Sequence, residues 1–226
     1  AAWRRYWSFL SALWRATAAP GPIFAQDGIA SGLPALVVAK LRGRRLVVRV
    51  AGDFAWERAQ VAYGYADSIE EFQKDMSVPP SIFLLRVLQR LVYRRADRVI
   101  APSAYLAGVA KGWGVPEGRV RVIYNGVRLP KTAEPVEKRP HRVVAAGRLV
   151  PWKNFDVLIK AMPRVLAKFP DASLMIVGDG PEETRLRSLA GAPMLKGRIN
   201  LVGRLKREEV CQAISASGVF VLPSAY

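Results

Sequence analysis

The sequence contains one cysteine, Cys211, and one histidine, His141. An intrachain disulfide needs two cysteines, and structural zinc sites use several cysteines or histidines. Both kinds of cross-link are therefore excluded within these 226 residues. The single cysteine also agrees with a reducing compartment.

Long apolar runs are absent as well. None approaches the ~18 residues that a helix needs to span a bilayer. The best candidate, residues 31–41, is interrupted by Lys40 and by the arginines that follow it. The chain starts without methionine, and Arg15 follows the first apolar stretch, an order that signal peptides do not have. We therefore expect neither a membrane span nor a signal peptide, and we expect a fragment truncated at both ends.

Acidic residues are scarce: 18 Asp and Glu stand against 35 Lys and Arg, giving a formal net charge of +17. This charge favours nucleotides, phosphates, nucleic acid or an acidic membrane as partners, and it does not choose among them. The N-terminal segment is both aromatic and basic, with Trp3, Arg4, Arg5, Tyr6, Trp7, Trp14 and Arg15. Such rings suit a membrane interface, but packing against the first sheet is the favoured interpretation.

Apolar periodicity predicts short strands that alternate with helices. In the first half, strands are expected at 22–27, 45–50, 98–103 and 119–125, and helices at 3–16, 29–41, 81–95 and 105–113. Residues 52–80 are polar and aromatic and receive no element. In the second half, strands are expected at 142–147, 172–178, 198–203 and 218–224, and helices at 155–169, 182–190 and 207–215.

A break separates the two halves. Residues 126–141 carry three prolines and many charges without a sustained apolar period. We predict domains at 1–128 and 141–226 joined by a linker at 129–140. Because alternating strands and helices form parallel sheets, the predicted class is α/β, with two Rossmann-like parallel-sheet domains facing a cleft, both incomplete.

The stretch GRLVPWKN lies between a predicted strand, which ends at Gly147 and Arg148, and a helix that follows Lys153. A Walker A loop is excluded, because Trp152 stands where that loop needs glycine and Asn154 where it needs a hydroxyl. A helix N-terminus attracts anions through its unpaired amides, so Arg148 and Lys153 are candidates for holding a diphosphate. The alternative is two solvated surface charges.

Four motifs follow one another in the second half: GRLVPWKN, SLMIVGDGPEETRLRSLA, INLVGRLKREEV and VFVLPSAY. In this order they resemble the nucleotide-binding domain of the family-four retaining glycosyltransferases (glycosyl transferases group 1), which have the GT-B fold. The stretch RRADRVIAPSAYLAGVAKGWGVPEGRVRVIYNGV resembles the end of the acceptor-side domain in the same family. The resemblance covers nearly the whole chain from about Phe24 onward.

The resemblance implies a donor site in the second domain. Gly147, Arg148 and Lys153 would hold the donor diphosphate, and Arg148 and Lys153 would act catalytically by stabilising the leaving group. The nucleotide base would be read, largely through backbone groups, by Val202, Gly203, Arg204 and Leu205. The segment 178–181, GDGP, would line the site, and a tight strand-to-helix turn is its favoured interpretation.

The sequence also departs from the family pattern. The paired-glutamate motif would come after Tyr226, and the glycine-rich loop of the first domain is missing. Where members often carry a histidine, this sequence has Ala-Gly-Asp, so Asp53 is a candidate sugar or acceptor contact. Asn125 is a second candidate for such a contact. It lies in an NGV segment that resembles the family hinge, and the alternative interpretation of this segment is a simple Asn-Gly turn. His141 is predicted to be a surface residue without a catalytic role.

The implied activity is transfer of a hexose-type sugar, with retention, from a nucleotide diphosphate sugar to a saccharide or lipid-linked acceptor. No Asp-x-Asp motif is present. We therefore expect no metal, and no cofactor other than the donor substrate, with Arg148 and Lys153 replacing a divalent ion. The fragment alone is expected to be inactive.

The expected setting is cell envelope polysaccharide biosynthesis, in the cytoplasm or peripheral at the anionic inner face of the cell membrane. The alternative is a non-catalytic anion- or nucleic-acid-binding protein. The basic residues of this sequence are spread along the whole chain, and no RNP-like, KH-like or zinc-finger pattern occurs. We therefore expect no specific nucleic acid partner.

Overall fold

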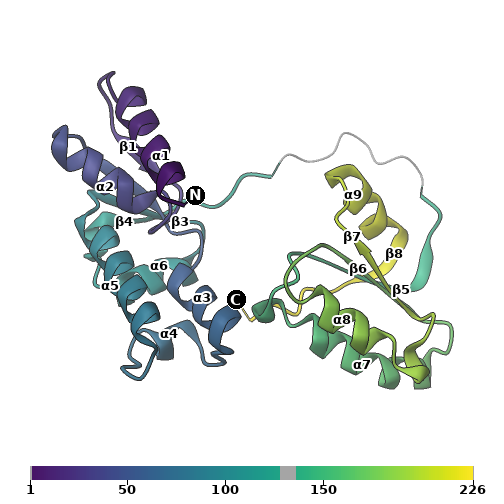
Figure 1. Cartoon of the computed structure of the whole chain (residues 1–226). Coiled ribbons are helices and arrows are strands. Elements are labelled where there is room, and N and C mark those ends of the chain that lie inside the picture. The colour runs from purple at the N-terminus through teal and green to yellow at the C-terminus, as the bar shows by residue number, and fades with distance from the viewer. Residues whose placement is uncertain (1, 128–135, 226) are drawn as a thin grey trace. The chain divides into compact units, whose positions relative to one another are not determined.

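The computed structural model describes residues 2–127 and 136–225, with the side chains of residues 2–6 outside this description. The chain divides into two compact units, residues 1–127 and 128–226 (Figure 1). Most of the predicted linker, residues 128–135, lies outside the described residues. Strand β5 (Arg139–Ala146) begins two residues before the predicted start of the second domain.

The first unit contains the predicted parallel sheet. Its described strands are β1 (Ile23–Ala25), β2 (Leu46–Arg49), β3 (Arg98–Ala101) and β4 (Val120–Val122). They pair in that order, each parallel to its neighbour, with Val48 of β2 in register with Val99 of β3. Val48 and Val99 are both fully buried. Parallel strands are covered on both faces, so their inward positions are apolar and β-branched.

Four helices of the first unit were predicted: α1 (Ala2–Ala16), α2 (Gly32–Leu41), α5 (Pro80–Arg95) and α6 (Ala104–Gly112). Helix α2 packs on β1 and β2, and α6 packs on β3 and β4. The start of α6 is fixed by Ser103, whose hydroxyl accepts a hydrogen bond from the amide of Leu106 at 3.1 Å. A 3₁₀ turn, η1 (Glu117–Arg119), precedes β4.

Two further helices form in residues 52–80, where none was predicted: α3 (Phe54–Tyr63) and α4 (Ile69–Phe72). Asp53 caps the start of α3, and Gly64, with a φ of 67°, ends it. Helix α4 begins with a capping box formed by Ser68 and Glu71. These start and stop signals are visible in the sequence, but the apolar periodicity between them is weak.

Helix α1 packs on α2 rather than on the sheet. The guanidinium of Arg42 lies 3.9 Å from the centre of the Trp14 ring and donates a hydrogen bond to the Trp14 carbonyl oxygen at 2.8 Å. Trp7 and Trp14 remain 62% and 44% exposed. The favoured interpretation of the N-terminal aromatic residues was therefore wrong for these two, because their rings lie at the surface.

The second unit has the same strand-helix alternation. Its described strands are β5, β6 (Ser173–Val177), β7 (Ile199–Gly203) and β8 (Ser217–Phe220), in the order β7-β6-β5-β8 and all parallel. The helices are α7 (Phe155–Lys168), α8 (Glu183–Ala190) and α9 (Arg207–Ala216). Short 3₁₀ turns, η2 (Pro151–Lys153) and η3 (Pro193–Leu195), lie before α7 and β7.

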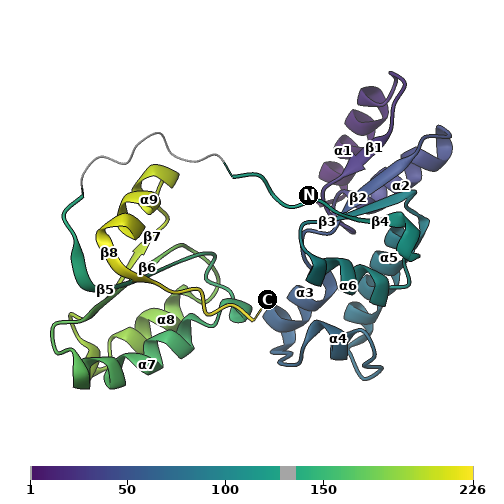
Figure 2. The same cartoon turned by 180° about the vertical axis from the view of Figure 1, so that it is seen from behind.

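Helices cover both faces of this second sheet. Helices α7 and α8 lie on one face and α9 on the other, as the two opposite views show (Figure 1, Figure 2). Successive strand residues point to opposite faces. Accordingly, Ala145 and Ile176 pack in the core under α7 and α8, whereas Val144 and Val177 pack under α9. Helix α7 enters the first of these cores through Phe155, Ile159 and Met162.

Candidate functional site

A pocket of about 510 Å³ opens in the second unit, where the strands of its sheet end. The ends of β5 and β6, the segment after β7 and one side of α9 line it. Its lining residues are Ala146, Gly147, Arg148, Val177, Gly178, Asp179, Arg204, Leu205 and Val210. All of them belong to the second unit.

The strand order explains why a pocket forms there. Strand β5 pairs with β6 on one side and with β8 on the other, so the chain changes direction across the sheet at β5. The connections after the strands therefore diverge to opposite faces, toward α7 on one and α9 on the other. In open parallel sheets this divergence leaves a crevice beyond the carboxyl ends of the strands, which is where ligands bind.

Glycines allow the loops under the pocket to approach one another closely. Gly178 has a φ of 144°, and a Cβ atom there would lie 1.8 Å from the carbonyl oxygen of Gly147. Gly180 has a φ of 157°, and its Cβ would lie 2.3 Å from the carbonyl oxygen of Leu149. A side chain at either position would push these loops apart. The GDGP segment is thus a turn whose glycines are required by close backbone contact.

Backbone hydrogen bonds hold these loops together. The amide of Gly147 donates to the Val177 carbonyl at 2.9 Å, and the amide of Leu149 donates to the Asp179 carbonyl at 2.8 Å. The amide of Gly178 donates to the carbonyl of Gly203 at 2.8 Å. The ends of β5, β6 and β7 therefore form one connected platform beneath the pocket.

Charged side chains stand around this platform. Arg148, Asp179 and Arg204 are exposed and line the pocket. Within the described residues, none of the three side chains forms a hydrogen bond or an ion pair with another residue. The two guanidinium groups can therefore bind an anion without first breaking a protein contact, and a planar guanidinium can bind two phosphate oxygens at once.

Lys153 is not among the residues that line the pocket. It ends η2, immediately before α7, and is half-buried. Asn154 follows in the left-handed region with a φ of 52°, and its side-chain amide donates to the Pro223 carbonyl at 3.0 Å. The amide of Ala225 donates to the carbonyl of Trp152 at 2.9 Å. The segment after β8 is therefore anchored along the turn that carries Lys153.

The four residues predicted to read a base divide into two pairs. Arg204 and Leu205 line the pocket. Gly203, with a φ of 76°, uses its carbonyl to hold the platform, and Val202 packs with the core under α9. Gly178 and Asp179 of the GDGP segment also line the pocket, whereas Ala146, Val177 and Val210 line it without having been predicted. Val210 lies on α9 and reaches the pocket only through the tertiary packing of that helix.

The structure corrects the expectation for Asp53. Its side chain is fully buried in the first unit. One carboxylate oxygen accepts hydrogen bonds from the Trp56 amide at 3.1 Å and from Nε2 of Gln89 at 2.9 Å, and the other accepts from Nε1 of Trp113 at 2.8 Å. Burial raises the pKa of the Asp53 carboxyl to about 6, although these hydrogen bonds lower it. Asp53 caps α3 and links it to Gln89 of α5 and to Trp113 at the end of α6. Because its side chain is fully buried, it is not accessible to a ligand.

Asn125 lies in a polar cluster that the sequence did not reveal. Its side-chain oxygen accepts a hydrogen bond from Nη2 of Arg49 at 2.9 Å, and Nη1 of Arg49 donates to Oε1 of Gln26 at 3.2 Å. Asn125 follows β4, Arg49 ends β2 and Gln26 follows β1, so the exposed side chains of Gln26 and Asn125 meet the half-buried Arg49 at the carboxyl edge of the first sheet. The sequence signal is a polar residue at or shortly after the end of each of these three strands.

His141 lies far along β5 from the pocket, near the opposite end of that strand. Its Nδ1 lies 2.5 Å from Oδ2 of Asp171, and both side chains are exposed, as a surface residue would be. The described part of the chain holds no group of three His, Cys, Asp or Glu residues placed to bind a metal ion. Among the same residues, no helix is long and apolar enough to cross a membrane.

Comparison with known families agrees with this geometry. A model of Glycosyltransferase Family 4 matches residues 1–131, and a model of Glycosyl transferases group 1 matches residues 130–226. The chain belongs to glycosyltransferase family 4. The two matches meet at residues 130–131, a few residues from the boundary between the two structural units at residues 127 and 128.

Individual relatives are similar over shorter stretches. A GDP-mannose-dependent monoacylated α-(1-6)-phosphatidylinositol monomannoside mannosyltransferase of Corynebacterium glutamicum is 40% identical over 82 residues, which are 36% of this chain and 21% of the relative. A putative colanic acid biosynthesis glycosyltransferase, WcaL, of Salmonella typhimurium is 29% identical over 136 residues, 59% of this chain and 34% of the relative. The chain thus spans about one fifth to one third of these two relatives.

Solved glycosyltransferase structures share the fold. The crystal structure of Anabaena HepE in complex with UDP has a TM-score of 0.65 and 17% sequence identity, covering 96% of this chain and 57% of HepE. The two parallel sheets of this family 4 glycosyltransferase are therefore the Rossmann-like sheets of a GT-B fold, as the sequence predicted. The pocket described above lies in the second of them.

Proposed function

We propose that this glycosyltransferase binds a nucleotide diphosphate sugar in the pocket of its second unit. We further propose that it transfers the hexose-type sugar, with retention, to a saccharide or lipid-linked acceptor. The observation that carries the proposal is the pair of unpaired cations, Arg148 and Arg204, at the rim of a glycine-lined pocket where strands end. The predicted diphosphate residues Gly147 and Arg148 both belong to that lining.

The reaction breaks the bond between the anomeric carbon of the sugar and the terminal phosphate oxygen. The nucleoside diphosphate leaves with that electron pair, and the acceptor hydroxyl passes its proton to the departing phosphate oxygen as its own oxygen bonds to the sugar. Arg148 would neutralise the negative charge that grows on the diphosphate. Lys153, which stands at the start of α7, would add a second positive charge at a helix N-terminus. These two side chains would take the place of a divalent metal.

The remainder of the pocket suits a nucleoside. Leu205 and Val210 provide an apolar wall against which a base can pack, and Arg204 provides hydrogen-bond donors at the same end. Gly147 and Gly178, which both line the pocket, would present backbone groups without a side chain to the ligand.

The relatives support the finer parts of the proposal. One is by name a GDP-mannose-dependent mannosyltransferase acting on a phosphatidylinositol mannoside, and another is named for colanic acid biosynthesis. HepE has been crystallised with UDP and with UDP-glucose. These names support a nucleotide-sugar donor, and an acceptor in cell envelope polysaccharide or glycolipid biosynthesis.

The first unit would carry the acceptor. The cluster of Gln26, Arg49 and Asn125 presents amide and guanidinium groups at the carboxyl edge of its sheet, where hydroxyl groups of a saccharide can be bound. In this proposal Asn125 keeps its predicted role as an acceptor contact, and Arg49 joins it. Asp53 has no direct part in binding.

The alternative of a non-catalytic anion- or nucleic-acid-binding protein is not favoured. Both family models that match the chain are glycosyltransferase models, and together they cover it from end to end. Two of the cations that would contact the ligand, Arg148 and Arg204, line one pocket. Nucleic acid binding would instead be favoured by a long basic surface with a helix or sheet shaped to a groove.

The test is calorimetric titration of the protein with UDP, GDP and ADP. We expect one of the three to bind with micromolar affinity and Arg148→Ala to weaken that binding by about tenfold or more, because charge-assisted contacts contribute about 1.5–3 kcal/mol. The matched control is Arg198→Ala, an exposed arginine before β7, at the other end of the sheet from the pocket. Equal weakening by both variants, or no binding of any nucleotide by folded protein, would contradict the proposal.

A further inference from the structure

Helix α5 carries an apolar face that no other described element covers. Phe83, Leu84, Val87 and Leu91 are 40%, 57%, 46% and 38% exposed. At about 100° per residue these four positions fall within about 100° of arc, so they form one stripe along the helix. The opposite side of α5 is buried against α2 and α3 through other residues, among them Val92 and Tyr93.

Arginines border this stripe. Arg90, Arg94 and Arg95 are exposed in the second half of the helix, and α5 contains no acidic residue. Within the described residues none of the three guanidinium groups pairs with a carboxylate. The nearest acidic residue after the helix, Asp97, accepts a hydrogen bond from the Leu46 amide at 2.7 Å. The positive charge at this end of α5 therefore remains uncompensated.

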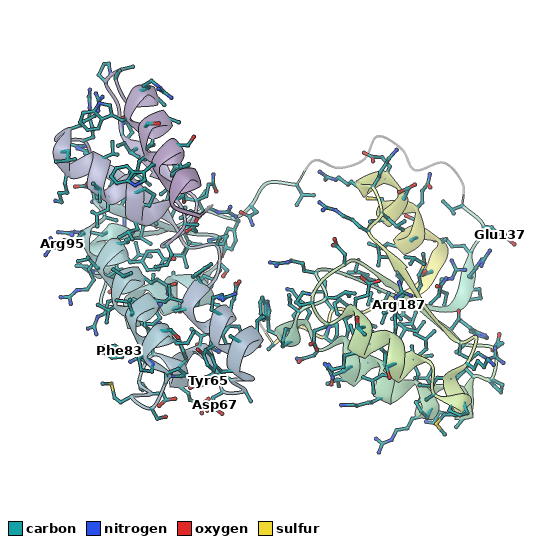
Figure 3. The ribbon with its side chains drawn as sticks, in the orientation of Figure 1. Tyr65, Asp67, Phe83, Arg95, Glu137 and Arg187 are labelled. Atoms are coloured by element: carbon teal, nitrogen blue, oxygen red, sulfur yellow. The ribbon has the colours of Figure 1, made fainter. Side chains whose placement is uncertain are left out.

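The apolar and the basic residues face outward together. Phe83 and Arg95 both lie at the outer rim of the first unit, on the same side of α5 (Figure 3). The inner side is fixed by Arg86, whose Nη1 donates to the Phe72 carbonyl at 2.8 Å. The helix cannot roll to bury the stripe without breaking that buried contact. The exposed face is thus a permanent feature of the surface.

We propose that α5 docks the first unit on an anionic bilayer. An apolar stripe bordered by basic residues on one side of a helix is the pattern that lies in the plane of a membrane interface. The arginines would bind lipid phosphates while the four apolar side chains enter the boundary between headgroups and acyl chains. A second copy of the same helix fits less well, because two arginine clusters without acidic partners would face each other.

The proposal goes beyond the donor site and stands without it. A bilayer contact uses only the first unit, and nucleotide binding uses only the second. Loss of one therefore need not affect the other. If the acceptor is lipid-linked, α5 would also bring the enzyme to the surface where that acceptor resides.

The experiment is flotation of the protein with vesicles of phosphatidylcholine alone and of equal parts phosphatidylcholine and phosphatidylglycerol. We expect binding only to the second kind and a decline with added salt. Each basic side chain near an anionic surface contributes roughly a factor of five to binding, so Arg94→Glu with Arg95→Glu should reduce it by about tenfold or more. Val87→Ser with Leu91→Ser should also reduce it, because the apolar contact is lost.

Matched controls lie in the second unit. Lys196→Glu with Arg198→Glu makes the same change in net charge at two exposed residues, and Val157→Ser with Met194→Ser removes two exposed apolar side chains. These variants should bind as the parent does, and thermal melting should show all variants folded. Nucleotide titration of each variant reports separately on the donor site.

Three results would overturn the proposal. The first is no flotation of the parent protein with anionic vesicles at low salt. The second is equal loss of binding in the second-unit controls, which would mean attraction by net charge alone. The third is a concentration-dependent dimer in sedimentation velocity that Val87→Ser with Leu91→Ser abolishes while flotation is unchanged, which would assign the face to a second copy of the chain.

Discussion

Gly178 lies directly against Gly147: a Cβ on Gly178 would stand 1.8 Å from the Gly147 carbonyl oxygen. The loop that carries Arg148 and the loop that carries Asp179 are therefore in direct backbone contact, with no side chain between them. Because both loops line the pocket, this contact sets its shape.

Gly178→Ala should destabilise the protein and remove nucleotide binding. Its φ of 144° is strained for alanine and its Cβ would overlap a backbone carbonyl, so we expect a loss of about 3 kcal/mol in the free energy of unfolding. Gly191→Ala is the matched control, since its φ is −76° and its Cβ would make ordinary contacts at 3.5 Å. Urea unfolding of both variants tests this, and similar losses would contradict it.

In the complete protein, Arg148→Ala and Lys153→Ala should each lower turnover by about a hundredfold or more, since removing a group that stabilises transition-state charge has effects of that size. Arg148→Lys should recover only part of the loss, because an ammonium cannot bind two phosphate oxygens in a fork. Steady-state rates with the donor that binds measure this. Unchanged turnover in either alanine variant would remove that residue from the catalytic assignment.

Turnover of the complete protein should be unaffected by EDTA. In the proposed mechanism Arg148 and Lys153 supply the positive charge that a divalent ion would otherwise bring to the diphosphate. The measurement is the initial rate before and after chelation, with magnesium or manganese added back. A loss that either ion restores would show that the two side chains do not suffice.

Asp53 should make the stability of the first unit depend on pH. Burial raises its pKa from 3.8 to about 6, so the folded state holds the proton more tightly than the unfolded state does. This contribution is present below about pH 4 and is lost as the pH rises through about 6, an effect of about 3 kcal/mol. Asp53→Asn, which can still cap a helix, should remove this dependence from unfolding free energies measured between these pH values.

A second variant tests the cause of that dependence. Trp113→Phe deletes the indole N–H that donates to the Asp53 carboxylate at 2.8 Å. Losing a donor to the charged form should raise the pKa of Asp53 further and extend the decline in stability to higher pH. Parallel stability curves for parent, Asp53→Asn and Trp113→Phe would refute the role of this buried carboxyl.

Asn154 should hold the segment after β8 in place. Asn154→Gly keeps the left-handed conformation but loses the hydrogen bond to the Pro223 carbonyl, whereas Asn154→Ala loses the hydrogen bond and adds strain. We expect faster hydrogen exchange at the Ala225 amide in both variants, and a loss of about 1 kcal/mol more in the alanine variant. Equal stability of the two variants would mean that the φ of 52° carries no strain.

Much of the fold could be predicted from the sequence. The apolar runs at β2, β3 and β6 and the helical spacing of Phe155, Ile159 and Met162 in α7 are local patterns, so strands and helices could be predicted from them. Helices α3 and α4 were missed because their residues are amphipathic only weakly, and the caps at Asp53 and Ser68 are better guides there. Motif order was enough to reach the family and to name Gly147, Arg148, Arg204 and Leu205, all of which line the pocket.

Local sequence therefore specified most of the elements, the parallel class of the sheets and the motifs that line the pocket, because periodicity and turn chemistry act over a few residues. Whether a polar residue is buried or exposed, and which groups it hydrogen-bonds, depended on contacts between segments that are distant in the sequence. Asp53 is buried by Gln89 and Trp113, which lie 36 and 60 residues away, and Asn125 meets Arg49 across 76 residues. A carboxylate becomes a cap or a ligand contact according to which side chains surround it, and those neighbours are brought together only when the sheets and helices pack.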